Sequence, residues 1–247
     1  GKSPGKLLPA TLVSDGEYQR KIREFDEFVK YVVNHPNVRV ITFRELPELI
    51  EKTPSMISIK LVSELAKKAL TSLSYYNIEN VILSAAEAFG ALVATLAYYH
   101  VEKKLPSEVR IRPLFGPIKT PLNVKTKFTV PTSSILEECF RLDESLDSTD
   151  YIPSYIEVEN KKIGPGTFMK VLAKIVTLLN EKKVIPDEIQ IEPWKEVPEI
   201  PGVDFVERVK KQWKWIIYPR GFSSQKILNH TLLQSWTWKP TKLKTSP

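Results

Sequence analysis

Residues 89–113 read FGALVATLAYYHVEKKLPSEVRIRP and residues 168–193 read FMKVLAKIVTLLNEKKVIPDEIQIEP, so one pattern occurs twice, 79–80 residues apart. The two stretches share identical residues in the same order, namely Phe89 and Phe168, Ala94 and Ala173, the Glu-Lys-Lys triplets at 102–104 and 181–183, and, after a one-residue insertion, Pro106 and Pro186. Each copy combines an apolar helical stretch with a short strand. A repeat of this length predicts a duplicated supersecondary unit rather than a scaffold for a single catalytic site.

The repeat predicts an α/β (α+β) fold built from two tandem helix–strand–helix–strand units. One unit is too small to cover its own apolar helix face, and a second copy related by a pseudo-two-fold axis supplies the missing surface. Ser84 followed by Glu87 forms a capping box, which predicts the start of the main helix in the first copy. Pro165 suits the first position of that helix in the second copy, because the N–H that proline lacks would be unpaired there. We expect Phe89 and Phe168 to be buried near these two helix starts.

Proline-rich joints divide the chain into four expected segments. These are an N-terminal arm with a helix at about 17–34 and a strand at 38–43 (residues 1–53), repeat unit 1 (54–122), repeat unit 2 (123–200) and a basic, tryptophan-rich C-terminal extension (201–247). We expect the extension to be ordered, with a helix near 223–234, because disordered tails are poor in aromatic residues.

The composition is that of a globular chain without a recognisable catalytic or metal-binding motif. The 247 residues are 42% hydrophobic and carry a net charge of +7, and no apolar run reaches the roughly 18 residues that span a bilayer. The single cysteine, Cys139, is expected to be an inert, half-buried thiol. The three histidines share no metal-ligand spacing, and neither a G-x-S-x-G elbow nor a phosphate-binding loop is present. We therefore predict no catalytic residue, no metal site and no cofactor.

The C-terminal extension differs in composition from the rest of the chain. From residue 203 onward it holds nine basic and two acidic residues, whereas the remainder holds 27 of each. Tryptophans alternate with other residues at 210–215 and at 236–240, and as strands these segments would each present two tryptophans on one face. Such a face can stack on sugar rings or unpaired bases; alternatively, the tryptophans clamp the extension onto the repeat units. The candidate ligand-binding residues are Trp213, Trp215, Arg220, Trp236, Trp238 and Lys239.

The stretch at 25–50, FDEFVKYVVNHPNVRVITFRELPELI, resembles the closing helix and strand of polysaccharide deacetylases. The two repeat copies are similar to the pseudomurein-binding type of cell-envelope repeat, which follows deacetylase-like domains in archaeal proteins, and the ending at 234–240 is similar to theirs. The Asp-Asp and His-x-x-x-His motifs that hold the metal of those enzymes do not occur in this sequence. The resemblance therefore implies the non-catalytic C-terminal part of such a protein, or a relative that lost the catalytic half. It assigns no catalytic residue.

The leading hypothesis is a non-catalytic module, extracellular or in the cell envelope, that binds polysaccharide or cell-envelope glycan. A second hypothesis is nucleic-acid binding in the cytoplasm through the basic aromatic extension, because phosphate backbones select concentrated positive charge. A third is a structural subunit of a homo-oligomer or larger assembly, with the extension as a strap between subunits. Salt separates the first two hypotheses, since phosphate binding weakens steeply between about 50 and 200 mM salt.

Overall fold

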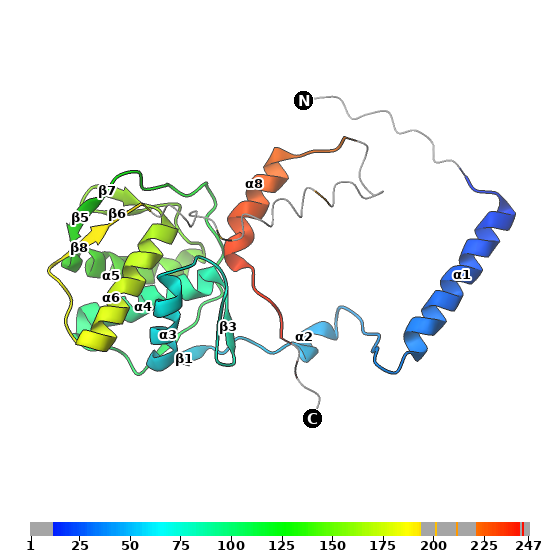
Figure 1. The fold of residues 1–247 in the computed structure, drawn as a ribbon, viewed down its shortest axis with the longest axis horizontal. Coiled ribbons are helices and arrows are strands. Elements are labelled where there is room, and N and C mark those ends of the chain that lie inside the picture. The colour runs from blue at the N-terminus through cyan, green and yellow to red at the C-terminus, as the bar shows by residue number, and fades with distance from the viewer. Residues whose placement is uncertain (1–11, 194–200, 202–210, 212–220, 243, 245–247) are drawn as a thin grey trace. The chain divides into compact units, whose positions relative to one another are not determined.

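The computed structural model describes residues 12–193, 201, 211, 221–242 and 244, and within them the chain forms two compact units (Figure 1). One unit comprises residues 1–51 with 242–247, and the other comprises residues 52–241. The described elements are helices and short antiparallel strand pairs, so the predicted α+β class is confirmed. None of the described helices combines the length and apolarity that crossing a membrane requires.

The larger unit contains one order of elements twice. The first copy consists of β1 (Met56–Ser58), α3 (Ile59–Ala69), β2 (Tyr76–Ile78), β3 (Val81–Leu83), α4 (Ala85–Glu102) and β4 (Glu108–Arg110). The second copy consists of β5 (Phe128–Pro131), α5 (Thr132–Thr149), β6 (Ile156–Val158), β7 (Lys161–Ile163), α6 (Pro165–Lys182) and β8 (Glu188–Ile191). The predicted duplication is therefore confirmed. Each copy also has an opening strand and a hairpin, which the predicted helix–strand–helix–strand unit did not include.

Strand pairing is the same in both copies. The opening strand pairs antiparallel with the closing strand, as β1 with β4 and β5 with β8, and the two middle strands form a hairpin. The hydrogen bonds at the start of the first helix also correspond. The Ile59 N–H donates to the Ser107 carbonyl at 2.9 Å, and the Thr132 N–H donates to the Asp187 carbonyl at 2.8 Å. Main-chain contacts thus repeat together with the elements.

The caps of the main helices correct the sequence alignment by one residue. Both N-caps and both C-caps lie 80 residues apart, at Ser84 and Gly164 and at the left-handed Lys103 and Lys183. With this spacing Phe89 corresponds to Met169, and not to Phe168 as the sequence alignment predicted. The identical Glu-Lys-Lys triplets misled that alignment, because helix caps fix the backbone position whereas exposed side chains at a helix end do not.

The two copies differ in the length of their first helix. α3 has 11 residues and α5 has 18, a difference of about two helical turns. The added turns of α5 carry Asp143 and Asp147, which both bind the buried Arg112 just after β4. Arg112 Nε lies 2.6 Å from Asp147 Oδ1, and its Nη1 lies 2.7 Å from Asp143 Oδ1. The extension of α5 therefore ties the second copy to the end of the first.

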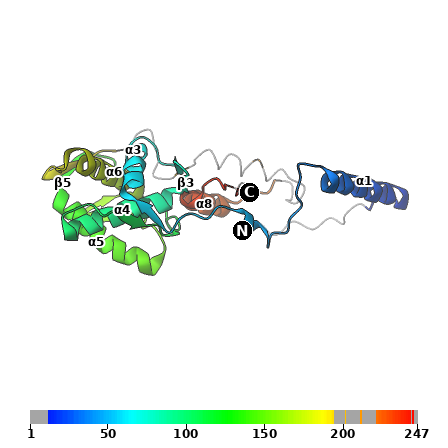
Figure 2. The same cartoon turned by 90° about the horizontal axis from the view of Figure 1, so that it is seen from below.

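The core is formed where helices of one copy pack against helices of the other. α3 packs on α6, α5 packs on α4, and α4 also packs on α6 (Figure 2). Phe89 and Phe168 are each 0% exposed, as predicted, and their ring centroids are 6.3 Å apart. A contact between the two main helices at these rings buries the apolar face that neither copy covers alone.

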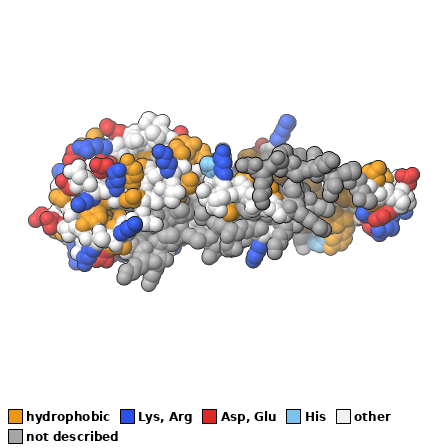
Figure 3. Space-filling view, turned by 90° about the horizontal axis from the view of Figure 1, so that it is seen from above, with side chains coloured by type: hydrophobic (Ala, Val, Ile, Leu, Met, Phe, Trp, Pro, Cys, Tyr) orange, Lys and Arg blue, Asp and Glu red, His pale blue; other side chains and the backbone are white. Residues whose placement is uncertain are grey.

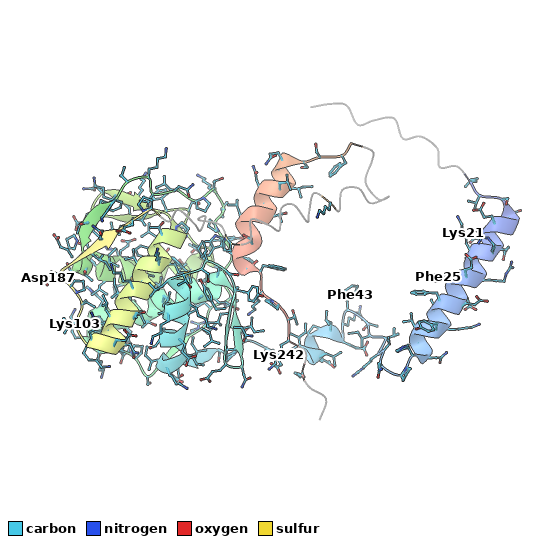
Figure 4. The ribbon with its side chains drawn as sticks, viewed as in Figure 1. Lys21, Phe25, Phe43, Lys103, Asp187 and Lys242 are labelled. Atoms are coloured by element: carbon cyan, nitrogen blue, oxygen red, sulfur yellow. The ribbon has the colours of Figure 1, made fainter. Side chains whose placement is uncertain are left out.

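The smaller unit contains α1 (Asp15–Asn34), capped by the Ser14 hydroxyl, and the short α2 (Leu46–Leu49). The predicted helix at 17–34 is confirmed, whereas the predicted strand at 38–43 does not form. That segment has no strand partner among the described residues, and Phe43 at its end is 93% exposed (Figure 4). Its alternating Val and Ile residues favour extended backbone, but a strand needs a second strand for its hydrogen bonds.

Truncating the paired phenylalanines tests the shared core. Phe89→Ala and Phe168→Ala should each lower the free energy of unfolding by about 3–5 kcal/mol, because each removes a fully buried ring. The double variant should lose less than the sum, since the rings contact each other. Urea unfolding followed by circular dichroism measures all three, with Phe140→Ala at a partly exposed ring as the control. Losses under about 1 kcal/mol at Phe89 or Phe168 would contradict the packing.

The Arg112 cluster predicts a pH dependence of stability. Hydrogen bonds from Arg112 lower the pKa of Asp147. The ionised Asp147 therefore stabilises the fold fully above its unfolded-state pKa of about 3.9, and this stabilisation is lost as the pH falls through the lower folded-state pKa. Asp147→Asn should therefore reduce stability at neutral pH, and its difference from the parent chain should shrink below about pH 4. Asp187→Asn, at an exposed side chain, is the control. A difference that is constant with pH would contradict this mechanism.

Candidate functional site

Of the six predicted ligand-binding residues, three lie outside the described residues, two (Trp236 and Lys239) make contacts within the protein, and one (Trp238) is largely exposed. Trp213, Trp215 and Arg220 lie outside the described residues. Trp236 is 0% exposed and meets Phe89 edge-on, with ring centroids 6.2 Å apart, so it belongs to the core and has no face for a ligand. Trp238 is 47% exposed. The clamping alternative therefore holds for Trp236.

The local backbone explains why the two described tryptophans differ. The C-terminal segment forms α8 (Gln225–Gln234) and then the 3-10 helix η1 (Ser235–Thr237), and not a strand at 236–240 that would place both tryptophans on one face. Trp236 lies inside η1 and Trp238 is its extended C-cap, so the two side chains do not share a face. The predicted helix near 223–234 is confirmed by α8.

Gly116 allows the C-terminal segment to approach the first copy closely. A Cβ atom at this position would lie 2.0 Å from the Leu233 carbonyl oxygen and 3.1 Å from Cβ of Trp236. Any side chain there would push the end of α8 and η1 away from Phe89. Gly116 thus has a packing role that composition alone does not reveal.

Lys239 is an anchor for the same segment. Its Nζ lies 2.7 Å from both carboxylate oxygens of Glu87 and also donates to the Thr53 hydroxyl. Glu87 is buried and already belongs to the capping box of α4, where its Oε2 accepts from the Ser84 N–H at 2.7 Å. A buried carboxylate requires a paired cation. Lys239 is therefore engaged by Glu87 and Thr53, although it also lines the cleft beside Trp238.

The remaining candidate, Trp238, pairs with a residue that sequence reasoning missed. Its ring meets that of Tyr75 edge-on at 6.5 Å, and Tyr75 is 40% exposed. Trp238 also borders a cleft of about 460 Å³, in which Thr231, Gln234 and Thr237 offer hydroxyl and amide groups. His230 and Lys239, the latter paired with Glu87, line the same cleft. An aromatic surface beside neutral hydrogen-bonding groups is suited to a polyhydroxylated ligand.

A repeated heptapeptide carries the signal that would have found Tyr75. Residues 74–80 read SYYNIEN and residues 154–160 read SYIEVEN, so serine, tyrosine, glutamate and asparagine recur at the same positions. Both peptides lead into the hairpin of their copy, β2–β3 or β6–β7. The longer repeat at 89–113 and 168–193 drew attention to core helices and away from this exposed segment.

The surface of the repeat pair is nearly neutral. Residues 52–193 contain 18 basic and 17 acidic side chains, and the two signs are interspersed over the face shown in Figure 3. The excess positive charge of the chain lies after residue 203, in a segment that is mostly outside the described residues. The cleft beside Trp238 lies outside this balanced region, and its one lysine, Lys239, is already paired with Glu87.

Other reactive groups in the described part of the chain are engaged or buried. Cys139 is fully buried and not half-buried as predicted, and burial raises the pKa of its thiol. A second cleft of about 380 Å³ lies along α4, β4 and α5, but its Arg112 and Asp143 side chains already pair with each other. Among the described residues no cluster of three or more His, Cys, Asp or Glu side chains is arranged to hold a metal.

The Lys239–Glu87 pair predicts how firmly the C-terminal segment is held. Lys239→Met should destabilise the chain by about 2–4 kcal/mol, because it leaves the Glu87 carboxylate buried without its cation. Adding Glu87→Gln should restore part of that loss, since glutamine can still complete the capping box. Lys60→Met, which breaks the exposed pair with Glu79, should cost less than about 1 kcal/mol. Thermal or urea unfolding of the three variants and the parent chain compares these effects, and equal losses for Lys239→Met and Lys60→Met would contradict the anchor.

Comparisons of the chain with protein-family models, with curated proteins and with solved structures found no match.

Proposed function

We propose that this chain is a non-catalytic module that binds cell-envelope polysaccharide, and that Tyr75 and Trp238 form its sugar-binding surface. The observation that carries the proposal is this partly exposed aromatic pair beside a cleft that offers hydroxyl and amide groups. Sugar rings have apolar C–H faces that pack on aromatic side chains and hydroxyl groups that hydrogen-bond at their edges. The cleft offers both kinds of contact within one short segment, residues 230–239.

The surface is also preorganised. The backbone N–H of Trp238 donates to the Ser235 carbonyl at 3.2 Å, and the next residue, Lys239, is fixed by Glu87. Trp236 two residues earlier is fully buried. Fixing the residues on either side lowers the entropy that Trp238 would lose on binding. An aromatic residue held in this way is suited to bind a ligand as weakly interacting as a sugar.

Charge favours a glycan over a nucleic acid as the ligand of this surface. A phosphate backbone is bound through concentrated lysine and arginine, and the residues of the repeat pair are almost balanced in charge. Nucleic-acid binding through residues 203–220 remains the competing function, because the net positive charge of the chain lies there and beyond. The extracellular or envelope location in this proposal is supported by the resemblance of the two copies to envelope repeats.

Binding to envelope polysaccharide tests the proposal. Trp238→Ala and Tyr75→Ala should each weaken binding at least about tenfold, which corresponds to the loss of about 1.4 kcal/mol of contact energy. Tyr98→Ala, at an equally exposed tyrosine on α4, should leave binding unchanged. Isothermal titration calorimetry with soluble polysaccharide, and quenching of tryptophan fluorescence, measure the effect.

The salt series decides between the two ligand classes. Affinity for polysaccharide should change little between about 50 and 200 mM salt, whereas phosphate binding would weaken steeply over this range. The proposal fails if the full chain binds no polysaccharide, or if single-stranded DNA binds tightly with that salt dependence while sugars do not.

A further inference from the structure

We infer that the second repeat copy carries an equivalent sugar subsite at Tyr155, so that one chain holds a polysaccharide at two points. The inference rests on the proposed function and extends it to residues that none of the candidates included. It starts from the heptapeptides SYYNIEN (74–80) and SYIEVEN (154–160), in which Tyr75 and Tyr155 occupy the same position 80 residues apart.

Structure alone accounts for the glutamate of the heptapeptides. Glu79 pairs with Lys60 at 2.8 Å and Glu159 accepts from the Ser134 hydroxyl at 2.5 Å, so each ties its hairpin turn to the first helix of its copy. Both glutamates have a positive φ of 49°. Asn160 also has a positive φ, 60°, which asparagine tolerates in tight turns, whereas Asn80 does not adopt this conformation. The glutamates therefore recur because the hairpin needs them.

The tyrosines recur without such a reason. Tyr155 is 43% exposed, close to the 40% of Tyr75, while the next residue in each copy points into the core. A packing residue loses its surface on folding, and these two rings keep much of theirs in both copies. Their recurrence is explained if each ring faces a ligand.

The surroundings of Tyr155 form a site of the required kind. The ring borders a cleft of about 530 Å³ that is also lined by Glu138, Arg141 and Glu157. Lys162 Nζ lies 4.4 Å from the ring centroid, so a cation orders the ring from one side. Burial raises the pKa of Glu138, while Arg141 opposes that shift. The second subsite therefore has one aromatic ring where the first has two, and a more charged rim, which suits a sugar of the same polymer.

Two subsites on one rigid pair of repeats have a measurable consequence. A short oligosaccharide should bind twice per chain, whereas a polymer long enough to reach both rings should bind more tightly than the oligosaccharide, because its second contact is intramolecular. Tyr155→Ala should leave one oligosaccharide site and should weaken polymer binding at least about tenfold. Tyr155→Phe keeps the ring and should retain both sites.

Calorimetry with a hexasaccharide prepared from envelope polysaccharide, and with the intact polymer, tests the inference on the full chain. The expected stoichiometry is two for the parent chain and the Tyr98→Ala control, one for Tyr155→Ala and for Trp238→Ala, and none for the double variant. A single site in the parent chain that Trp238→Ala removes and Tyr155→Ala leaves intact would overturn the second subsite and keep the first. An absence of binding to hexasaccharide and polymer alike would overturn the proposed function together with this inference.

Discussion

The contact between the two copies is the constraint on which the larger unit depends. Phe89 and Phe168 meet where α4 and α6 pack together, and the first helix of each copy lies against the main helix of the other. The strand pairs contribute little by themselves, because an isolated two-stranded sheet is at best marginally stable in water. The hairpins and terminal strands are therefore positioned by the helices that pack between the copies. A hairpin in turn positions Tyr75 and Tyr155, and the C-terminal segment that covers Phe89 positions Trp238.

The symmetry of the pair is broken at the places where polar partners differ. Glu87 of the first copy corresponds to Thr167 of the second, so a carboxylate that can anchor Lys239 occurs in the first copy alone. The C-terminal segment accordingly covers the main helix near Phe89. The longer α5 compensates in the other direction, since its added turns hold Arg112 of the first copy. One duplication has thus produced two similar hairpins with different surroundings, an aromatic neighbour for Tyr75 and a cationic one for Tyr155.

The sequence predicted the long helices and the closing strand of each copy, β4 and β8, and missed the opening strand β1, for physical reasons. Helix caps and apolar periodicity are local signals, and they located α1, α4, α6 and α8 within a few residues. β1 has three residues, too few for an alternating pattern, and it forms because β4 supplies its hydrogen bonds from far along the chain. The segment at 38–43 has the strand pattern and no partner. Burial of Trp236 depends on Gly116 and Phe89, which are distant in sequence, so composition suggested a displayed residue instead.

A residue can recur in both copies because the fold needs it or because a ligand does. Some buried residues recur as identities, as Leu92 and Leu172 do, and others only as apolar types, as at Phe89 and Met169, because a core tolerates different side chains of similar volume. An exposed identity needs another cause, and for the hairpin glutamates that cause is a bond to the first helix. Among the described residues the tyrosines make no such bond, and one of them lies beside the single described tryptophan that keeps a large exposed surface. The internal repeat therefore offers a comparison that separates the proposed binding surface from the scaffold that holds it.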